Sequence, residues 1–422
     1  MKSLSPLARL EARLALALLL PTVLIVLSIV LVPVAANFWI SFKPVELGDL
    51  RAPEPLAKEQ VRKRPKQPGE LLEVRYNLRG SNPGKPIQQV TLEDQVPPGL
   101  TVQDLDSRCQ LNGSRLRCDL GNWEPGFRER LTLKFKAEAS YLASPVNPQD
   151  SRPEIVGIAE NVLTSFDFTL DNYRRLIADP DFWPVLRVTF IYTIFGTLGS
   201  LFLGLFAAQL MNSSFRGRGF LRGLFLFPYV SPVIAVAFAW VFLLNPFSGT
   251  LNALGLKLGL LDQPLNLFGQ RVAQIELLGM EFDFPVALTT VIVFESWRYF
   301  PLAFLFILAR FQAIPQEMYE AARVDGASPF QQFFYITLPQ LVGILSVMFL
   351  LRFIWTFNKF DDIFLLTGGN AGTRTLTVNV YEQGFALANL GAGSAVSVVI
   401  FSVLALFLIL YFRYAPQGEE ND

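Results

Sequence analysis

The chain has 422 residues, of which 51% are hydrophobic and only 17% are charged, whereas a soluble domain is about 25% charged. Its 36 basic and 36 acidic residues balance, so the charge indicates neither nucleic acid nor a strongly polyanionic partner. There is no histidine, which excludes imidazole catalysis and histidine metal sites. The two cysteines are too few for a multi-cysteine zinc site, an iron–sulfur cluster or a disulfide-rich scaffold. Nearly half of the charges fall within positions 45–165, a segregation that a single soluble globule would not show.

Long stretches without Asp, Glu, Lys or Arg predict where the chain crosses a membrane. A helix needs about 20 apolar residues to cross the hydrocarbon core. Five stretches contain none of these residues, namely 14–42, 188–215, 223–256, 326–351 and 383–412, and a sixth, from 284 to about 309, is broken only by Glu295 and Arg298. The expected spans are residues 16–40, 185–211, 223–244, 285–309, 340–360 and 391–412.

The first span resembles a cleavable signal peptide, because Val34-Ala35-Ala36 looks like a cleavage site. The apolar core of a signal peptide is about 7–15 residues long. Here the uncharged stretch extends from 14 to 42, so we expect it to remain as a membrane helix.

The distribution of Lys and Arg in short loops predicts the topology. Six spans place both termini on one side of the membrane, and that side holds most of the basic residues: Lys2, Arg9, Arg13, Arg216, Arg218, Arg222, Arg310, Arg323 and Arg413. The opposite short loops have fewer, chiefly Lys257, Arg271 and Arg374. Basic residues stay in the cytoplasm, so we expect cytoplasmic termini and an external segment 43–184.

Between residues 70 and 140 the hydrophobic period changes to two, as in Leu72–Tyr76 and Leu131–Lys136. Turn signals such as Pro97-Pro98-Gly99 separate these runs, a spacing typical of a small β-sandwich. Residues 51–69 are rich in Pro, Lys and Arg and are interpreted as a linker. The expected domains are therefore residues 1–42, an external domain 43–165, and a membrane core 166–422.

The two cysteines have a spacing that fits a hairpin. A two-residue turn at Gly113-Ser114 would pair Cys109 with Cys118, whereas a turn at Asn112-Gly113 would misalign them. Because the compartment outside the membrane is oxidising, we predict a disulfide worth roughly 2–3 kcal/mol. The alternative is two inert buried thiols.

Two runs in the same region, Thr91–Leu100 and Cys118–Gly126, resemble a family of bacterial extracytoplasmic Ig-like repeats. The resemblance implies an Ig-like sandwich with a structural or adhesive role.

The loop at 310–340, between the fourth and fifth spans, has a distinct pattern. Residues 316–325 are strong helix formers, and Gly326 can adopt the left-handed conformation that ends a helix. Ser328 and Pro329 suit the start of a second helix, which we expect to end near Pro339. Two short helices that meet at a glycine beside the membrane would form a compact knob for another protein.

Glu320-Ala321-Ala322, Gly326 and Ile336-x-Leu338-Pro339 make this loop resemble the EAA loop of binding-protein-dependent ABC importer permeases, in particular their carbohydrate branch. The resemblance implies the type I permease fold: an all-α polytopic membrane protein of six helices, here with the inserted sandwich. It also implies that the knob couples to a separate ATPase subunit. The implied coupling residues are Glu320, Ala321, Ala322, Asp325, Gly326 and Ala327.

Further motifs resemble the maltose-type membrane subunit, which also carries a large external insertion: Phe227-Pro228-Tyr229, Trp297–Pro301, Phe357–Phe360 and Leu365–Gly369. The chain departs from it in lacking two extra N-terminal helices and in its different sandwich. The resemblance implies a second permease subunit, two ATPase subunits that hold ATP and magnesium, a solute-binding protein, a sugar substrate and a bacterial inner membrane. It implies no cofactor, metal or catalytic residue in this chain.

Charged and aromatic residues within the fourth and fifth spans need a partner or a wet cavity. The maltose-type resemblance, together with their chemistry, makes eight residues candidates for lining a sugar site: Tyr229, Trp297, Arg298, Tyr299, Arg352, Thr356, Asn358 and Lys359. Arg298, Arg352 and Lys359 replace small or neutral residues of that subunit, which would favour an anionic or larger substrate. The alternatives are a structural Glu295–Arg298 pair and a Lys359 that extends its amine to the membrane surface.

Three classes of function are consistent with these features. The chain has no P-loop motif for ATP hydrolysis and no nucleophile–base pair, which favours a permease subunit over an enzyme. An ion-coupled secondary transporter would show repeats and broken helices, and neither is visible in the sequence. A membrane-anchored adhesion or sensor protein would explain the sandwich and leave the loop at 310–340 unexplained.

Overall fold

The computed structural model describes residues 6–277 and 279–414, and the chain forms two compact units. One unit, rich in strands, comprises Phe42–Leu170 together with Ala388–Gly391, and the other is helical. The strand-rich unit therefore begins and ends near the expected boundaries of 43 and 165. Its short second segment, 388–391, was not expected.

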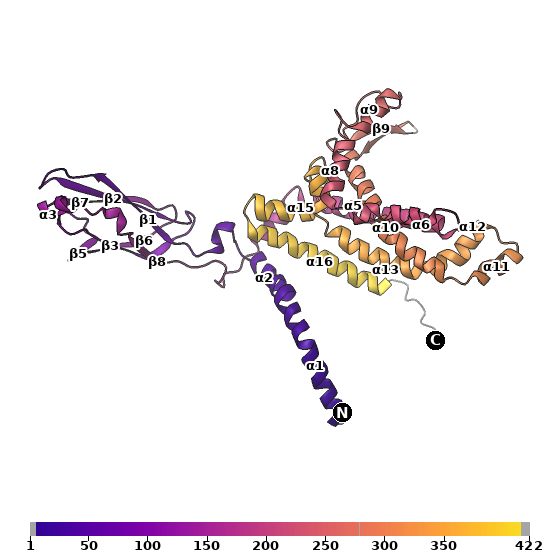
Figure 1. Ribbon diagram of the computed structural model, residues 1–422, viewed down its shortest axis with the longest axis horizontal. Coiled ribbons are helices and arrows are strands. Elements are labelled where there is room, and N and C mark those ends of the chain that lie inside the picture. The colour runs from indigo at the N-terminus through magenta and orange to yellow at the C-terminus, as the bar shows by residue number, and fades with distance from the viewer. Residues whose placement is uncertain (1–5, 278, 415–422) are drawn as a thin grey trace. The chain divides into compact units, whose positions relative to one another are not determined.

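The strand-rich unit contains two antiparallel four-stranded sheets (Figure 1). Sheet A has the order β1-β2-β7-β4, formed by Pro55–Lys63, Leu71–Gly80, Arg128–Ala137 and Leu100–Asp104. Sheet B has the order β5-β6-β3-β8, formed by Cys109–Asn112, Arg115–Trp123, Ile87–Gln95 and Glu154–Ile158. The short helix α3 (Ala139–Ala143) and two 3₁₀ turns, at Leu47–Leu50 and Pro148–Asp150, complete the unit.

One hydrophobic core lies between the sheets, because alternate residues of each strand point inward. On β2 and β7 these are the runs Leu72–Leu78 and Leu131–Ala137, which pair in the register Leu72↔Phe135 and Val74↔Leu133. From sheet B, Trp123 is fully buried and stacks on Phe127. The alternation of apolar and polar residues in the sequence therefore arises, as predicted, from strands that have one face in the core.

The linker predicted at 51–69 is wrong over much of its length, since Pro55–Lys63 is strand β1. The Pro and charged residues that suggested a linker are compatible with a strand because β1 lies at the edge of sheet A. An edge strand tolerates proline at its end and charge on its open side.

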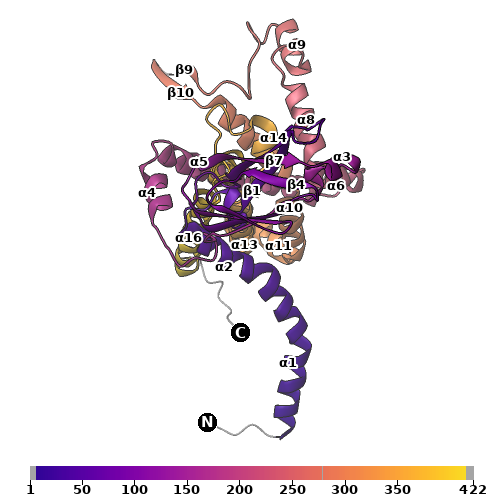
Figure 2. The same cartoon turned by 90° about the vertical axis from the view of Figure 1, so that its left-hand side faces the viewer.

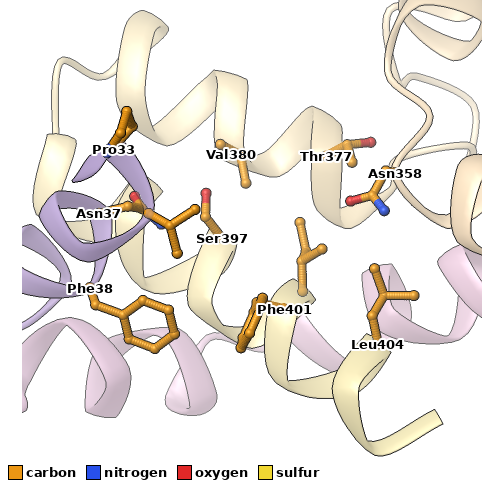
Figure 3. A pocket seen from close by; sticks show the side chains of 11 residues that line it. Pro33, Asn37, Phe38, Asn358, Thr377, Val380, Ser397, Phe401 and Leu404 are labelled. Atoms are coloured by element: carbon orange, nitrogen blue, oxygen red, sulfur yellow. The ribbon is translucent and has the colours of Figure 1, made fainter. Parts of the chain in front are cut away.

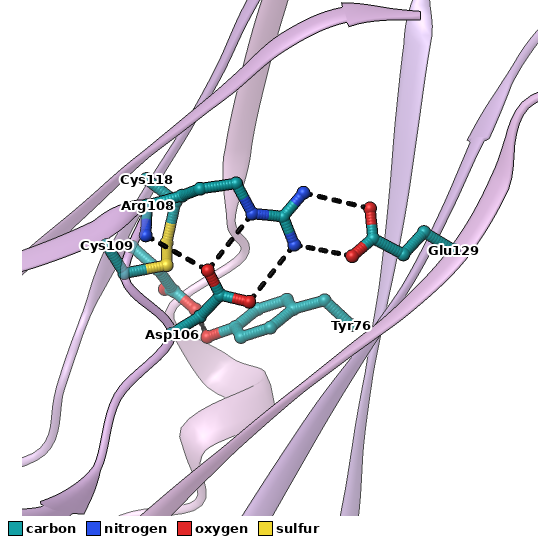
Figure 4. The surroundings of a disulfide bond; sticks show 7 residues. Tyr76, Asp106, Arg108, Cys109, Cys118 and Glu129 are labelled. Atoms are coloured by element: carbon teal, nitrogen blue, oxygen red, sulfur yellow. Dashed lines mark hydrogen bonds and ion pairs between the residues drawn. A yellow bond between two sulfur atoms is a disulfide. The ribbon is translucent and has the colours of Figure 1, made fainter.

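The hairpin β5–β6 has the register Cys109↔Cys118 and Leu111↔Leu116, with Gly113 and Ser114 in the turn. Gly113 adopts a positive φ of 67°, as the first position of the expected turn requires. A disulfide joins the two cysteines (Figure 4). Beside it, the Arg108 guanidinium bonds the carboxylates of Asp106 and Glu129 and lowers the pKa of Asp106.

The helical unit contains five helices that are long and apolar enough to cross a bilayer, counted among the described residues. They are Ala17–Ser41, Phe182–Asn212 (α5), Val286–Ala313 (α10), Pro329–Phe357 and Leu390–Tyr414 (α16). The first comprises the C-terminal part of α1 (Pro6–Val26) and α2 (Val32–Ser41), joined by a π turn at Leu27–Leu31. These helices coincide with five of the six expected spans.

The remaining expected span, the third, at 223–244, is not one helix. The segment forms α6 (Arg218–Phe225), α7 (Phe227–Val230) and α8 (Val233–Leu243), and the chain bends by 93° before α8. Pro232 explains the break, because it has no N–H to continue the hydrogen bonds of α7 and disfavours a helical conformation at Ser231. The expectation that the sequence contains no broken helix is therefore wrong as well.

Helices α5 and α10 lie so close that only small residues fit between them. A Cβ atom on Gly204 would come within 2.6 Å of the Ala303 Cβ, and one on Gly199 within 2.2 Å of the Ser296 hydroxyl. Small residues allow helix backbones to approach in this way inside a membrane. This contact fixes α10, which carries Glu295 and Arg298, two of the charged residues discussed below.

Short elements connect the long helices. Helix α4 (Asp171–Ala178) precedes α5, and α14 (Asp361–Thr367) and α15 (Leu376–Tyr381) precede α16. Residues 245–284, where no element was expected, form helix α9 (Thr250–Lys257) and the hairpin β9–β10 (Ala273–Leu277 and Met280–Phe284) (Figure 2).

We predict that Cys109 and Cys118 are oxidised in the mature protein, because the register brings them face to face. Mass spectrometry of a non-reduced tryptic digest should recover both in one cross-linked peptide. Recovery of two free thiols would contradict the prediction.

The stability of the strand-rich unit should fall as the pH rises. Glu59 is 7% exposed, and burial, followed by the charges of Asp94 and Asp150, raises the pKa of its carboxyl from 4.5 to about 7. The folded state therefore holds this proton more tightly than the unfolded chain, so the free energy of unfolding decreases between pH 4.5 and about 7 and is constant above.

Hydrogen exchange of β1 and β2 in the full chain, corrected for intrinsic rates, measures this dependence. Glu59→Gln should remove it, whereas the matched change at Glu73, whose side chain is on the outer face of β2, should not. An unchanged pH dependence in Glu59→Gln would assign the effect to another group.

Candidate functional site

The segment that follows α10 forms the expected knob. Helix α11 spans Gln316–Val324, and Gly326 follows it with a positive φ of 80°. Helix α12 (Pro329–Gln332) begins at Ser328, whose hydroxyl accepts the Gln331 N–H while the Gln331 side chain accepts the Ser328 N–H. The start of α11, the glycine that ends it and the cap of α12 therefore lie at the residues predicted from the sequence.

The second helix of the knob does not end near Pro339. Helix α12 continues through a π turn at Phe333–Thr337 into α13 (Leu338–Phe357), so that Pro329–Phe357 is one helix. Pro339 lacks the N–H that would bond the Tyr335 carbonyl, and the adjacent π turn is a common way to absorb such a disruption. A movement of the knob would therefore be transmitted directly to α13.

The knob is tied to the helices and exposed on its outer side. The Tyr319 hydroxyl bonds that of Thr337 at 2.9 Å, and Arg310 at the end of α10 bonds Gln340 in α13. The implied coupling residues Glu320, Asp325 and Gly326 are exposed, Ala321 is exposed, and Ala322 and Ala327 are half-buried. Large apolar side chains near them are also exposed to solvent: Val324 is 87% exposed and Phe330 is 72% exposed.

The second group of candidate residues lies around a buried ion pair. The Glu295 carboxylate on α10 bonds the Arg352 guanidinium on α13 at 2.5 Å, and both side chains are almost fully buried. Glu295 also accepts hydrogen bonds from Tyr192 on α5, at 2.9 Å, and from Thr356, at 3.1 Å. The alternative of a Glu295–Arg298 pair is therefore wrong: one turn of helix separates those two, but the Glu295 side chain points to α13.

Arg298 instead stabilises the break in the third segment. Its guanidinium donates to the Pro228 carbonyl at 3.2 Å and to the Ser231 carbonyl at 3.0 Å. The Pro228 carbonyl would normally accept from residue 232, and Pro232 has no N–H. Arg298 thus supplies the donor that the broken helix lacks.

A second carboxylate, Asp362 at the start of α14, completes the cluster. It is fully buried, and its oxygens lie 3.9 Å from Arg298 Nε and 3.6 Å from Lys359 Nζ. Neither oxygen has a hydrogen-bond donor among the described residues. A buried carboxylate in this state depends on the two cations for compensation.

The Tyr299 ring lies at the centre of the three cations. The Arg352 guanidinium carbon and Lys359 Nζ are each 4.3 Å from its centroid, and that of Arg298 is 5.6 Å away. Lys359 also bonds the Tyr299 hydroxyl, and Tyr229 packs edge-on against the ring. Tyr229 is 37% exposed, so the cluster reaches a surface on that side.

The structure thus brings together six of the eight candidates: Tyr229, Arg298, Tyr299, Arg352, Thr356 and Lys359. Trp297 is directed elsewhere, against Trp240 and Phe294. Asn358 lines a separate hollow of about 550 Å³, with Asn37, Thr377 and Ser397 among its other residues (Figure 3). Consecutive residues of a helix face different directions, which explains why sequence proximity to the cluster misled in these two cases.

Two members of the cluster were not predicted. Tyr192 is an ordinary aromatic residue in an apolar span, and nothing in the sequence distinguishes it. Asp362 had a signal, because Lys359 and Asp361-Asp362 bring three charges together directly after a span.

The fold, the knob and the buried cluster together define a membrane component of a transporter. Residues 200–417 match the family of binding-protein-dependent transport system inner membrane components, and the chain belongs to this family. The main segment of the strand-rich unit, Phe42–Leu170, precedes the matched residues.

Named relatives agree with this assignment. The chain is 36% identical over 273 residues to the inner membrane ABC transporter permease protein YcjO of Escherichia coli, a match that covers 65% of this chain and 84% of the relative. It is 34% identical over 245 residues to the trehalose/maltose transport system permease protein MalF of Thermococcus litoralis, a match that covers 58% of this chain and 78% of the relative. A chain from the crystal structure of a bacterial alginate ABC transporter has the same fold, with a TM-score of 0.51 and 20% identity over 58% of this chain and 81% of that one. The chain is thus a sugar ABC importer permease by family, and its relatives are membrane subunits rather than enzymes.

If the Glu295–Arg352 pair is structural, removing one charge should destabilise the protein and removing both should not. We expect Glu295→Gln to cost about 3–5 kcal/mol of stability, because it leaves the Arg352 charge buried and unpaired. The double variant Glu295→Gln with Arg352→Met should recover the unfolding temperature and the yield.

The same double variant separates a structural role from substrate contact. In uptake assays, the double variant should have the same apparent KM for sugar as the unmodified protein. A recovered unfolding temperature with a strongly raised KM would show instead that Arg352 contacts the substrate.

Proposed function

We propose that the chain is the transmembrane permease subunit of an ATP-driven ABC importer, and that it translocates an oligosaccharide or a related solute delivered by a binding protein. The observation that carries the proposal is the knob formed by α11, Gly326 and α12. It presents apolar side chains to solvent around Glu320 and is continuous with α13, which bears Arg352 of the buried cluster. A partner that moves the knob would therefore move the cluster.

The partner proposed for the knob is an ATPase subunit. ATP and magnesium would be held there, and this chain would contribute no catalytic residue, cofactor site or metal site. Two such subunits, a second permease of similar core and an extracytoplasmic solute-binding protein would complete the importer. The alginate transporter of similar fold, whose structure is described as a complex with a pentasaccharide-bound periplasmic protein, supports delivery by a binding protein.

The proposed location is the bacterial inner membrane with both termini in the cytoplasm. The bent pair Arg218–Val230 and Val233–Leu243 would provide the third of six crossings. The strand-rich unit, proposed to be an Ig-like sandwich, would then lie outside, where its disulfide is compatible with the oxidising environment.

The buried cluster is the proposed sugar site only at its accessible side, where Tyr229, Tyr299 and Lys359 are not fully buried. Aromatic faces with a nearby ammonium group suit the apolar faces and hydroxyls of a sugar. Arg298, Arg352 and Lys359 each have a carboxylate within 4 Å, so their charges give no reason to require an anionic sugar.

The other classes explain less. The broken helix before α8 is a feature that ion-coupled secondary transporters share. However, neither that class nor an adhesion protein would need the exposed knob. Family membership also favours the permease.

Replacing Gly326 by valine should uncouple ATP hydrolysis from transport. A Cβ atom at Gly326 would meet nothing within 4 Å, so the only strain is that of a β-branched residue at a φ of 80°. The cost, about 1–2 kcal/mol, is too small to unfold the protein and sufficient to reorient α11. Sugar-stimulated ATPase activity and uptake in liposomes, reconstituted with the ATPase and the second permease, measure the effect.

Gly343→Val is the matched control, because Gly343 lies within α13 at an ordinary helical φ and also has open space around it. It should leave uptake unchanged. Normal uptake by Gly326→Val would mean that the loop does not couple ATP hydrolysis to transport. Full transport activity of this chain with the ATPase alone would mean that a second copy of this chain takes the place of the proposed second permease.

A further inference from the structure

The outer face of sheet A carries a concentration of positive charge. In β1, β2 and β7 the residues that alternate with the core point outward. Five basic residues among them are hereafter called the basic face: Lys58, Arg75, Arg79, Arg128 and Arg130. The same side of the sheet also carries Lys134, Lys136 and one carboxylate, that of Glu73. The strand register aligns them in rows, with Arg79 opposite Arg128 and with Lys58 and Arg130 on either side of Asn77. Four of them border a hollow of about 790 Å³, which is also lined by Glu129, a carboxylate already paired with Arg108.

These charges are not neutralised within the chain. Among the described residues, no carboxylate lies within ion-pair distance of any of the five. The one hydrogen bond of their side chains is the long one from Arg75 to Thr132, at 3.4 Å. By contrast Lys134, farther along β7, is paired with Asp104 at 3.0 Å.

The arrangement is unfavourable for the sheet itself, since like charges directly opposite on neighbouring strands repel. The outer face of sheet B is different: Arg115 and Arg117 there are offset by Glu93, Asp119 and Glu154. Folding alone therefore does not account for the basic face, and a bound anion would.

The surroundings of the basic face favour a polymer over a folded protein. Protein interfaces are built around buried aromatic and apolar anchors. The basic face has none, and Leu56 at its edge is the one large apolar side chain lining the hollow that is exposed. Strands lie about 4.8 Å apart and alternate residues about 7 Å apart, so the cations recur at intervals comparable to the length of a sugar residue.

We propose that the outer face of sheet A binds a linear anionic polysaccharide, whose carboxylates pair with Lys58, Arg75, Arg79, Arg128 and Arg130. Arginine forks are suited to carboxylates because they offer two parallel hydrogen bonds. The binding is independent of the proposed transport of sugar through the membrane helices. It gives the strand-rich unit a role in holding the protein to, or near, an acidic polymer.

The test uses the full chain in nanodiscs of zwitterionic lipid and polygalacturonate as the probe. Binding should be saturable and should weaken as the salt concentration increases. Removal of two cations, in the variant Arg79→Gln with Arg130→Gln, should weaken it by about tenfold, because each exposed ion pair contributes up to about 1 kcal/mol. The matched control Arg115→Gln with Arg117→Gln removes the same charge from sheet B and should bind as the unmodified chain does.

Stability provides a second readout. Losing cationic repulsion should leave the hydrogen-exchange protection of β2 and β7 unchanged or raised in the Arg79 and Arg130 variant, so weaker binding would not reflect unfolding. Methyl-esterified polygalacturonate, which has the same backbone without the charge, should not bind.

Three results would overturn the proposal. Absence of binding at low salt is the first, and equal weakening by the sheet B control, which indicates general charge attraction, is the second. The third is a preference for polyglutamate or for phosphatidylglycerol vesicles over polygalacturonate, which would assign the basic face to an acidic protein segment or to a lipid surface.

Discussion

The membrane part of this protein depends on the ion pair between Glu295 and Arg352. It joins α10 to α13, and the Tyr192 hydroxyl adds α5, so that three long helices meet at one carboxylate. Isolated charges of this kind are costly in an apolar environment, and they are tolerated because each is paired and hydrogen-bonded. The close α5–α10 contact at Gly199 and Gly204 holds Tyr192 within reach of Glu295.

The same cluster explains how a broken helix is stable inside the unit. Pro232 leaves the Pro228 carbonyl without its usual donor, and an unsatisfied carbonyl within a membrane is unfavourable. Arg298 satisfies both this carbonyl and that of Ser231, and is in turn balanced by Asp362. The break before α8, helix α10 and the start of α14 are therefore joined by one charge network.

Much of the architecture could be predicted from the sequence, because hydrophobic runs and period-two alternation report burial directly. Five spans, the strands β2 and β7, the hairpin register at Cys109 and Cys118, and the knob with its glycine stop followed from local patterns. What failed depended on distant contacts. Strand β1 has the composition of a linker and becomes a strand only because β2 offers it an edge. In the same way, the partner of Glu295 is set by helix packing, so that Arg352, 57 residues away along the chain, is closer than Arg298.

Net charge illustrates why composition is a weak guide to partners. The chain has equal numbers of acidic and basic residues, and this balance argued against an anionic partner. In the membrane cluster the balance is local, because every cation has a carboxylate within 4 Å. On the outer face of sheet A it is not, since no described carboxylate lies within ion-pair distance of the five cations of the basic face. A charge is informative about binding only when its neighbours are known: cations that fold the protein are already paired, and those of the basic face remain available to an anion from outside.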